Sequence, residues 1–213
     1  MTEKYVWYAS YGSNINTERF LCYIKGGKPE GSTKIETGCK DPSLPIASST
    51  FTMNYPLYFA KEARKWGSKG VAFIDLTEDP GCATLSKKYL ITLEQFRDIV
   101  SQENNGIDFH IDMNEVIKNG SKVFRDAWYG NILYLGEEEG YPVFSFTAPW
   151  SINDVDSKKP SHAYLTTIIK GLKVDYPNEE IFHYLQTKPG IKDHYTEDEL
   201  KKLIFEARKP FLS

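Results

Sequence analysis

The sequence has 213 residues, of which 40% are hydrophobic, 26% charged and 14% aromatic, a composition typical of globular proteins rather than disordered or fibrous ones. A chain of this length buries enough surface to fold without metals or disulfides, so no cofactor is expected. Lys and Arg number 26 against 29 Asp and Glu, giving a net charge of −3. This balance disfavours nucleic acids and anionic membranes as partners.

Targeting signals and paired cysteines are not evident in the sequence. The start, MTEKYVWYASYGSN, lacks a basic segment followed by an apolar one, and no stretch approaches the roughly 20 apolar residues that cross a bilayer. A cytoplasmic location is therefore expected. The three cysteines, Cys22, Cys39 and Cys82, are odd in number and widely spaced, which predicts reduced thiols rather than disulfides or a C-x-x-C site.

The first predicted elements are a strand, a loop and a helix. Residues 5–10 are aromatic and β-branched, so they predict a buried strand, which the segment Tyr11-Gly12-Ser13-Asn14 breaks. Asn16 is predicted to cap a helix with apolar residues between positions 20 and 24, and Gly26-Gly27 to end it. The segment from Gly26 to Pro56 is rich in Gly, Pro, Ser and Thr, and it is interpreted as a loop-rich insertion.

Strands are expected to dominate the middle of the chain. Residues 70–76 and 89–91 have strand-like patterns, and residues 128–135 and 141–147 form a predicted hairpin around the polar turn GEEEG. Between them, Thr92 and Gln95 have the spacing of a capping box that opens an amphipathic helix, with a stop near Asn104-Asn105-Gly106.

The C-terminal third is predicted to be helical. Residues 161–172 show helical spacing of apolar side chains, and a last helix opens at Thr196 to Glu199. Together the elements favour an α+β fold with a mixed, curved sheet or small barrel. We expect a single domain over residues 1–213, with the insertion around 26–56 and a helical C-terminal extension from about 173.

The segment Tyr11-Gly12-Ser13-Asn14 is the first candidate for chemistry. It joins the end of a strand to a helix N-terminus, where backbone N–H groups can receive a carboxylate or a developing oxyanion. Gly12 would let the backbone approach a ligand closely. The alternative is an ordinary tight connection in which Asn14 or Asn16 is only a helix cap.

Glu103 is the second candidate. On a helix over residues 93–104, the apolar residues Leu93, Phe96, Ile99 and Val100 share one stripe, and Glu103 lies within about 30° of its centre. A carboxylate turned toward the apolar side suits a general base or acid acting near neutral pH. The alternative is a fraying helix end whose carboxylate points into water or pairs with a lysine.

Two further groups of residues are candidates for chemistry. Asp108, His110 and Asp112 alternate, so in a strand they would share one face as metal ligands or a proton relay. A solvated face is the favoured alternative, because no other histidine cluster is near in sequence, and any metal found is expected to be incidental. Cys22 could be a nucleophile, but a small buried hydrophobic side chain is the commoner role of a lone cysteine.

Three motifs carry a family resemblance. YGSN follows the first strand and precedes the small apolar Ile15, Gln102-Glu103 ends a helix after Gly70-Val71, and Pro160-Ser161-His162-Ala163-Tyr164 comes later. In this order they resemble the γ-glutamyl cyclotransferase-like family, which has a catalytic Glu in a D-x-x-E-G-like segment and a P-S-x-x-Y helix start. The resemblance covers Tyr5 to about Leu172. The chain departs from the pattern after Glu103, where Asn-Asn-Gly-Ile-Asp-Phe replaces the usual G-x-x-x-x-Y.

The resemblance implies a fold, an activity and a site. The fold would be a small mixed β-barrel flanked by helices, with the YGSN loop and Glu103 facing one cavity. A γ-glutamyl amide would be cyclised to 5-oxoproline and a free amine or amino acid, a transferase or lyase reaction that needs no metal. The implied catalytic residue is Glu103, and the implied substrate-binding residues are Tyr11, Gly12, Ser13, Asn14 and Tyr164. The alternative is a non-catalytic protein of the same fold that binds or senses a small molecule.

Overall fold

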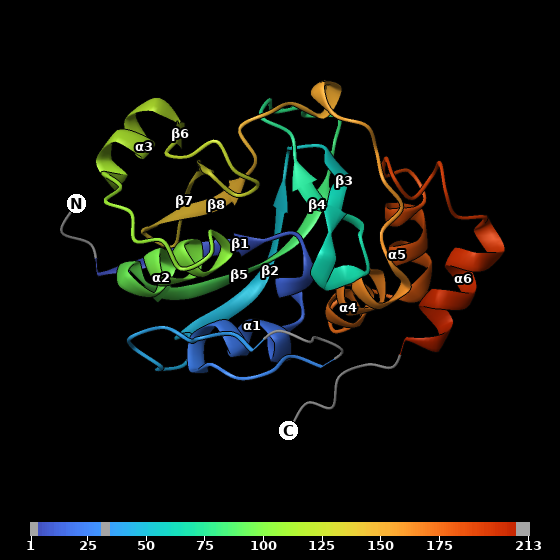
Figure 1. The fold of residues 1–213 in the computed structure, drawn as a ribbon, viewed down its shortest axis with the longest axis horizontal. Coiled ribbons are helices and arrows are strands. Elements are labelled where there is room, and N and C mark those ends of the chain that lie inside the picture. The colour runs from blue at the N-terminus through green and yellow to red at the C-terminus, as the bar shows by residue number, and fades with distance from the viewer. Residues whose placement is uncertain (1–3, 31–34, 208–213) are drawn as a thin grey trace.

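The computed structural model describes residues 4–30 and 35–207 (Figure 1). Outside the described part lie residues 1–3, 31–34 and 208–213. Of these, 31–34 belong to the expected insertion and 208–213 to the expected C-terminal extension. The strands are β1 Tyr5–Ser10, β2 Ala47–Met53, β3 Leu57–Ala63, β4 Lys69–Ile74, β5 Thr84–Thr92, β6 Ser121–Val123, β7 Asn131–Glu138 and β8 Tyr141–Thr147. The helices are α1 Thr17–Lys25, α2 Leu93–Glu103, α3 Met113–Asn119, α4 His162–Leu172, α5 Asn178–Leu185 and α6 Glu197–Glu206. Short 3-10 turns are η1 Ser13–Ile15, η2 Arg64–Trp66 and η3 Ile152–Asp154.

The strands form two sheets. The larger has the order β2-β5-β1-β8-β7-β6, and β1 at its centre pairs antiparallel with β5 and parallel with β8. The smaller sheet pairs β3 with β4. Thr147 at the end of β8 joins the two, because its Oγ1 accepts from the Ile74 N–H at 3.2 Å and donates to the Ile74 carbonyl at 2.7 Å. The α+β class with a mixed sheet flanked by helices is thus confirmed, and the described strands pair as these two sheets.

Two apolar cores lie on the two faces of the larger sheet. Side chains of β1 alternate between them, because successive residues of a strand point to opposite faces. Val6 and Tyr8 pack with α1, α2 and α3, whereas Trp7 and Ala9 pack with the smaller sheet and the C-terminal helices. Figure 1 shows the latter, α4, α5 and α6, grouped beside β3 and β4 at one side of the molecule.

The helix α2 begins and ends as its sequence predicts. The Thr92 side chain accepts from the Gln95 N–H at 3.1 Å, and the Gln95 side chain accepts from the Thr92 N–H at 3.0 Å, which completes the capping box. At the other end Asn105 and Gly106 adopt φ values of 65° and 75°, a left-handed conformation that stops a helix. Glu103 is therefore the last residue of α2.

Several predictions for individual segments need correction. The insertion around 26–56 contains β2, an edge strand paired along its whole length with β5. Residues 108–112 form no strand; Ile111 is buried there, and the Asp112 side chain caps α3 by accepting from the Asn114 N–H at 2.9 Å. β3, β6, α3 and α5 were not predicted. Among the described helices, none combines the length and apolar character needed to cross a bilayer.

Candidate functional site

A small cavity of about 30 Å³ opens where β1 ends. Its walls come from β1, the loop into η1, β4, α2, β8 and α4, segments that are far apart in the sequence. The lining residues are Tyr8, Ser10, Tyr11, Gly12, Ser13, Asn14, Ala72, Glu103, Tyr129, Phe146 and Tyr164. The cavity thus brings together all six residues that the sequence analysis singled out as catalytic or substrate-binding.

The YGSN loop is held close to α4. It enters the 3-10 turn η1, in which the Ile15 N–H donates to the Gly12 carbonyl at 3.0 Å, and Asn16 then caps α1. A Cβ at position 12 would lie 3.2 Å from the Tyr164 hydroxyl oxygen, so glycine permits this close approach. The hydroxyl of Tyr11 donates to the Phe146 carbonyl at 2.8 Å and anchors the loop to β8.

Two tyrosines bind the backbone of Ala72 in β4. The Ala72 N–H donates to the Tyr164 hydroxyl at 3.1 Å, and the Tyr129 hydroxyl donates to the Ala72 carbonyl at 3.3 Å. Burial is the main cause that raises the pKa of Tyr164 to about 12. The Tyr164 hydroxyl therefore keeps its proton at neutral pH, and because its oxygen accepts from Ala72, its own O–H is available as a donor to other groups at the cavity.

Glu103 is surrounded by tyrosines. Burial raises the pKa of Tyr8, Tyr23, Tyr129 and Tyr164 above the usual value, and the negative charge of Glu103 is a further cause for each of them. Tyr23 also donates a hydrogen bond to the Glu103 carboxylate. Glu103 itself is half-buried, so its carboxylate lies between the protein interior and the cavity mouth.

Asn14 brings an amide into the same cavity. The side chain is only 5% exposed, and its amide nitrogen has a long 3.5 Å contact to the Tyr8 hydroxyl. Within the described residues its Oδ1 atom has no hydrogen-bond partner. A buried acceptor without a donor costs free energy, so this oxygen is suited to accept a hydrogen bond from a ligand.

A buried arginine supports the loop from behind. Arg19 on α1 donates from Nε to the Ser13 hydroxyl at 2.9 Å and stacks over the Trp66 ring at 5.1 Å. Its guanidinium lies 3.9 Å from the carboxylate of Glu36, and the two residues are 4% and 1% exposed. Glu36 in turn pairs with Gly27 through two backbone hydrogen bonds of 2.8 and 3.0 Å. The insertion therefore supplies the counter-charge of the residue that holds Ser13.

A second, larger cavity adjoins the first. It has a volume of about 420 Å³, and Glu103 and Tyr129 belong to the walls of both cavities. The remaining lining residues are Glu62, Ala63, Arg64, Val71, Gln102, Asn104, Asn105, Ala127 and Trp128. Glu103 is thus positioned to contact groups in either cavity.

The remaining candidates lie elsewhere. Within the part of the chain that the structure describes, no three His, Cys, Asp or Glu side chains are grouped as metal ligands, and this includes Asp108, His110 and Asp112. Cys22 is half-buried, and burial is the main cause that raises its pKa, which leaves less of the reactive thiolate.

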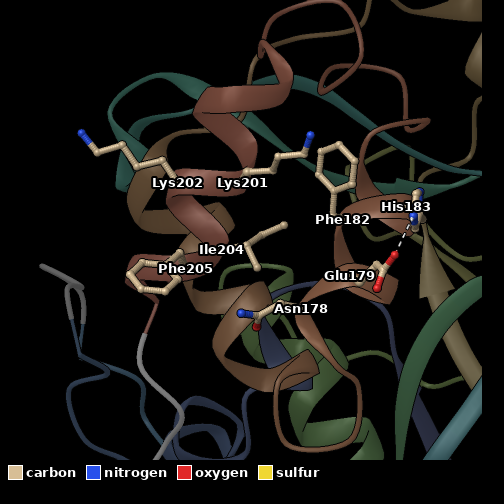
Figure 2. Close-up of a pocket in the computed structure, with 8 residues that line it drawn as sticks. All are labelled: Asn178, Glu179, Phe182, His183, Lys201, Lys202, Ile204 and Phe205. Carbon is tan, nitrogen blue, oxygen red and sulfur yellow. Dashed lines mark ion pairs between the residues drawn. The ribbon is translucent and has the colours of Figure 1, made fainter.

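Figure 2 shows a larger groove, of about 640 Å³, between α5 and α6. Phe182, Ile204 and Phe205 give it apolar walls, and the ion pair between Glu179 and His183, at 3.8 Å, lies at its edge. The basic side chains at the groove pair locally, as Lys201 does with Glu197 at 3.0 Å. The groove is larger than the cavity at β1, but its charged groups are satisfied within their own helices.

Sequence reasoning missed Tyr8, Tyr23, Tyr129 and Arg19. Tyr8 and Ser10 occupy alternate positions of β1 just before YGSN, and this period of two could have identified them as facing the same cavity. Arg19 and Tyr23 are four residues apart on α1, hence on one helix face. Tyr129 had no comparable signal, since nothing local distinguishes it among 14 tyrosines.

Comparisons with known proteins give one curated relative and several solved structures. No protein-family model matches the sequence. Histone deacetylase 5 of Arabidopsis thaliana is 36% identical over 183 residues, covering 78% of this chain and 28% of the relative. The chain therefore spans less than a third of the length of the curated relative that it matches.

The solved structures are matched over most of their length. A γ-glutamyl cyclotransferase has 18% identity and a TM-score of 0.49, over 95% of this chain and 99% of the other. An uncharacterized protein from Homo sapiens has 19% identity and a TM-score of 0.49, over 96% and 100%. A yeast γ-glutamyl cyclotransferase specific to glutathione has 13% identity and a TM-score of 0.39, over 97% and 98%.

Proposed function

We propose that this protein cyclises a γ-glutamyl amide to 5-oxoproline and releases an amine or amino acid, with Glu103 as the general base. One observation carries the proposal: Glu103, the YGSN loop and Tyr164, which are far apart in the sequence, line a single cavity. The sequence motifs resemble a family with this activity. Tyr23 donates a hydrogen bond to the Glu103 carboxylate, and Tyr164 lines the same cavity as Glu103, so the carboxylate is held beside groups that can bind a substrate, as a general base must be.

The reaction needs no group beyond the substrate and the protein. Glu103 takes one proton from the α-ammonium group, and the freed amine attacks the γ-carbonyl carbon and forms a five-membered ring. The bond from that carbon to the amide nitrogen then breaks. The proton held by Glu103 and the one lost from the ring nitrogen both go to the leaving nitrogen, so the products are 5-oxoproline and a protonated amine. No water or oxidant is consumed.

The other residues of the cavity orient the substrate in this proposal. Charge develops on the γ-carbonyl oxygen during attack, and the Tyr164 hydroxyl and the loop N–H groups are suitable donors for it. Asn14 Oδ1 is a suitable acceptor for the ammonium group. Because attack is intramolecular, orientation alone supplies much of the rate, with effective molarities on the order of 10⁵ to 10⁸ M for well-oriented groups.

A second candidate function is small-molecule binding without turnover. The relative named histone deacetylase 5 favours it, because the matched segment is 28% of that protein, a proportion compatible with a sensing module attached to another activity. Binding needs only a hydrogen-bonding group at position 103, whereas catalysis needs the carboxylate.

The test is a substrate panel followed by mass spectrometry. The purified protein is incubated with γ-glutamyl dipeptides and γ-glutamylamines, and 5-oxoproline is measured over time. An acetyl-lysine peptide is added to the panel because of the relative's name. Production of 5-oxoproline supports the proposal. Binding of a γ-glutamyl compound with no 5-oxoproline assigns the second candidate function, and deacetylation alone overturns both.

A further inference from the structure

The larger cavity beside Glu103 has walls of mixed character. Two of its polar residues are already engaged by the protein itself: Gln102 donates to the Tyr23 carbonyl at 3.0 Å and accepts from the Gly38 N–H at 3.1 Å. The Asn104 amide nitrogen donates to the carbonyls of Val100 and Tyr129 at 3.0 and 3.1 Å. These amides shape the wall rather than offer their N–H groups to a ligand.

Beside these amides, the cavity offers an apolar and aromatic part of its wall to a ligand. Trp128 and Tyr129 are half-buried and both contact Phe73, at ring distances of 6.1 and 5.3 Å, which fixes their rings. Ala63, Val71 and Ala127 complete the apolar part of the wall. Arg64 and Glu62 are exposed residues of the same lining. A volume of about 420 Å³ lies within the range of sites that hold small organic ligands.

The proposed reaction assigns the two cavities to different parts of the substrate. Glu103 must first take a proton from the ammonium group and later return one to the leaving nitrogen, so both nitrogens come within its reach. The small cavity, at about 30 Å³, has room for a water-sized group such as an ammonium. Asn14, whose Oδ1 has no hydrogen-bond partner among the described residues, lines this cavity. The rest of the substrate then extends past Glu103 into the larger cavity.

We propose that the larger cavity holds the leaving group and that this group is a bulky amine with an aromatic ring, packed against Trp128 and Tyr129. The inference rests on the proposed function and adds the substrate class to it. An arylalkylamine and an aromatic amino acid share this chemistry. They differ in the carboxylate of the amino acid, which Arg64 in the cavity lining could bind as a cation.

Four substrates separate ring from carboxylate. They are the γ-glutamyl derivatives of phenylalanine, alanine, 2-phenylethylamine and ethylamine, each assayed for 5-oxoproline. We expect kcat/KM to be at least about tenfold higher for each aromatic compound than for its small counterpart. Arg64→Gln is expected to lower kcat/KM only for the two amino-acid derivatives. Equal kcat/KM for aromatic and small substrates would overturn the inference and leave the proposed function standing.

Variants of the cavity wall test the inference, and a tryptophan outside the wall provides the matched control. Trp128→Ala is expected to reduce the preference for aromatic substrates by about 3- to 10-fold, the usual worth of an aromatic pair. Ala127→Phe, which fills the same cavity, is also expected to reduce the preference for aromatic substrates. Trp150 is also half-buried and also contacts Phe73, at 5.8 Å, but it lines neither cavity. Trp150→Ala should keep the preference, and if it removes the preference as Trp128→Ala does, the inference is wrong.

Direct binding distinguishes failure of this inference from failure of the proposed function. Titration of the protein with 2-phenylethylamine, followed by NMR of the tryptophan side chains, should move the Trp128 signal, with weaker binding in Trp128→Ala. Ethylamine should leave the Trp128 signal unmoved. If the aromatic amine binds but no substrate gives 5-oxoproline, the proposed function is overturned. The preference of the cavity for an aromatic ring then still stands. If 5-oxoproline forms but the amine does not bind at Trp128, only the present inference falls.

Discussion

The cavity at the end of β1 and the groove between α5 and α6 differ in the way their polar groups are satisfied. The groove is larger, about 640 against 30 Å³, and its charged residues pair along their own helices, as Lys201 does with Glu197. The cavity is smaller, but it contains a half-buried carboxylate, several buried hydroxyls and the unpartnered Asn14 Oδ1. Figure 1 shows α5 and α6 at one side of the molecule, away from β1, and Figure 2 shows the residues that line the groove on these two helices.

The two regions therefore differ in the character of their walls as well as in size. Apolar side chains at a surface are common, and an open apolar groove needs no specific ligand to be stable. Polar groups removed from water cost free energy unless they are hydrogen-bonded, so a concentration of them requires an explanation. The residues at β1 are therefore expected to respond to substitution in activity, and those of the groove are not.

The largest expected effect is that of Glu103→Gln on turnover. The variant keeps the size and hydrogen-bonding capacity of the side chain but removes the proton acceptor, so 5-oxoproline production should fall by about 10²- to 10⁴-fold. The melting temperature should stay close to that of the wild type, because glutamine can still accept from Tyr23. Glu179→Gln at the groove is the control and should turn over substrate normally. A Glu103→Gln protein that melts much earlier yet keeps full turnover would assign Glu103 to structure.

Arg19→Gln is expected to have the next largest effect, on stability. The substitution leaves the carboxylate of Glu36 buried without its cation, and breaking a buried pair in this way costs about 3–5 kcal/mol of unfolding free energy. Urea unfolding measures the loss. The double variant Arg19→Met with Glu36→Leu should recover much of it, because neither charge then remains. No recovery in the double variant would mean that the packing of Arg19 against Trp66 matters more than its charge.

Asn14→Leu separates binding from stability. The variant replaces an amide by an apolar side chain of similar volume, so the unpartnered acceptor is removed from the interior and unfolding free energy should hold or rise. Substrate affinity should fall by about tenfold, as expected for loss of one hydrogen bond to a charged group. The two quantities are measured by thermal melts and by KM on a γ-glutamyl substrate. A fall in stability with unchanged KM would instead make Asn14 a structural residue of the loop.

Because of its buried tyrosines, the protein is expected to have a lower unfolding free energy at alkaline pH. Burial raises the pKa of Tyr164 to about 12, whereas in the unfolded chain it is about 10. Between these values the unfolded state loses the proton first, so unfolding free energy falls as pH rises, by about 1.4 kcal/mol per pH unit for each such tyrosine. Urea unfolding at pH 9, 10 and 11 measures the slope. Tyr164→Phe should have a lower unfolding free energy than the wild type at neutral pH but a shallower fall with pH. An unchanged fall with pH would contradict the raised pKa of Tyr164.

The sequence predicted the elements that carry the candidate site better than the contacts within it. The strand before YGSN, the capping box of α2 and the inward phase of Glu103 follow from local patterns, and local chemistry determines them. Residues 108–112 show the limit: their alternation resembles a strand, but a strand also needs a neighbour to pair with, and in the structure Asp112 caps a helix instead. The edge strand β2 was missed for the opposite reason, because its polar, exposed residues depend on β5 for pairing.

Phe205→Ser tests the groove between α5 and α6 and has the smallest expected effect. Phe205 lies at the groove and is 81% exposed, so its replacement removes almost no buried surface, and unfolding free energy should change by less than about 0.5 kcal/mol. Production of 5-oxoproline should be unchanged, since no residue that lines the groove also lines the cavity at β1. Urea unfolding and the 5-oxoproline assay measure both. A clear loss of turnover would mean that the groove influences the cavity at β1, and the contrast between the two regions would no longer hold.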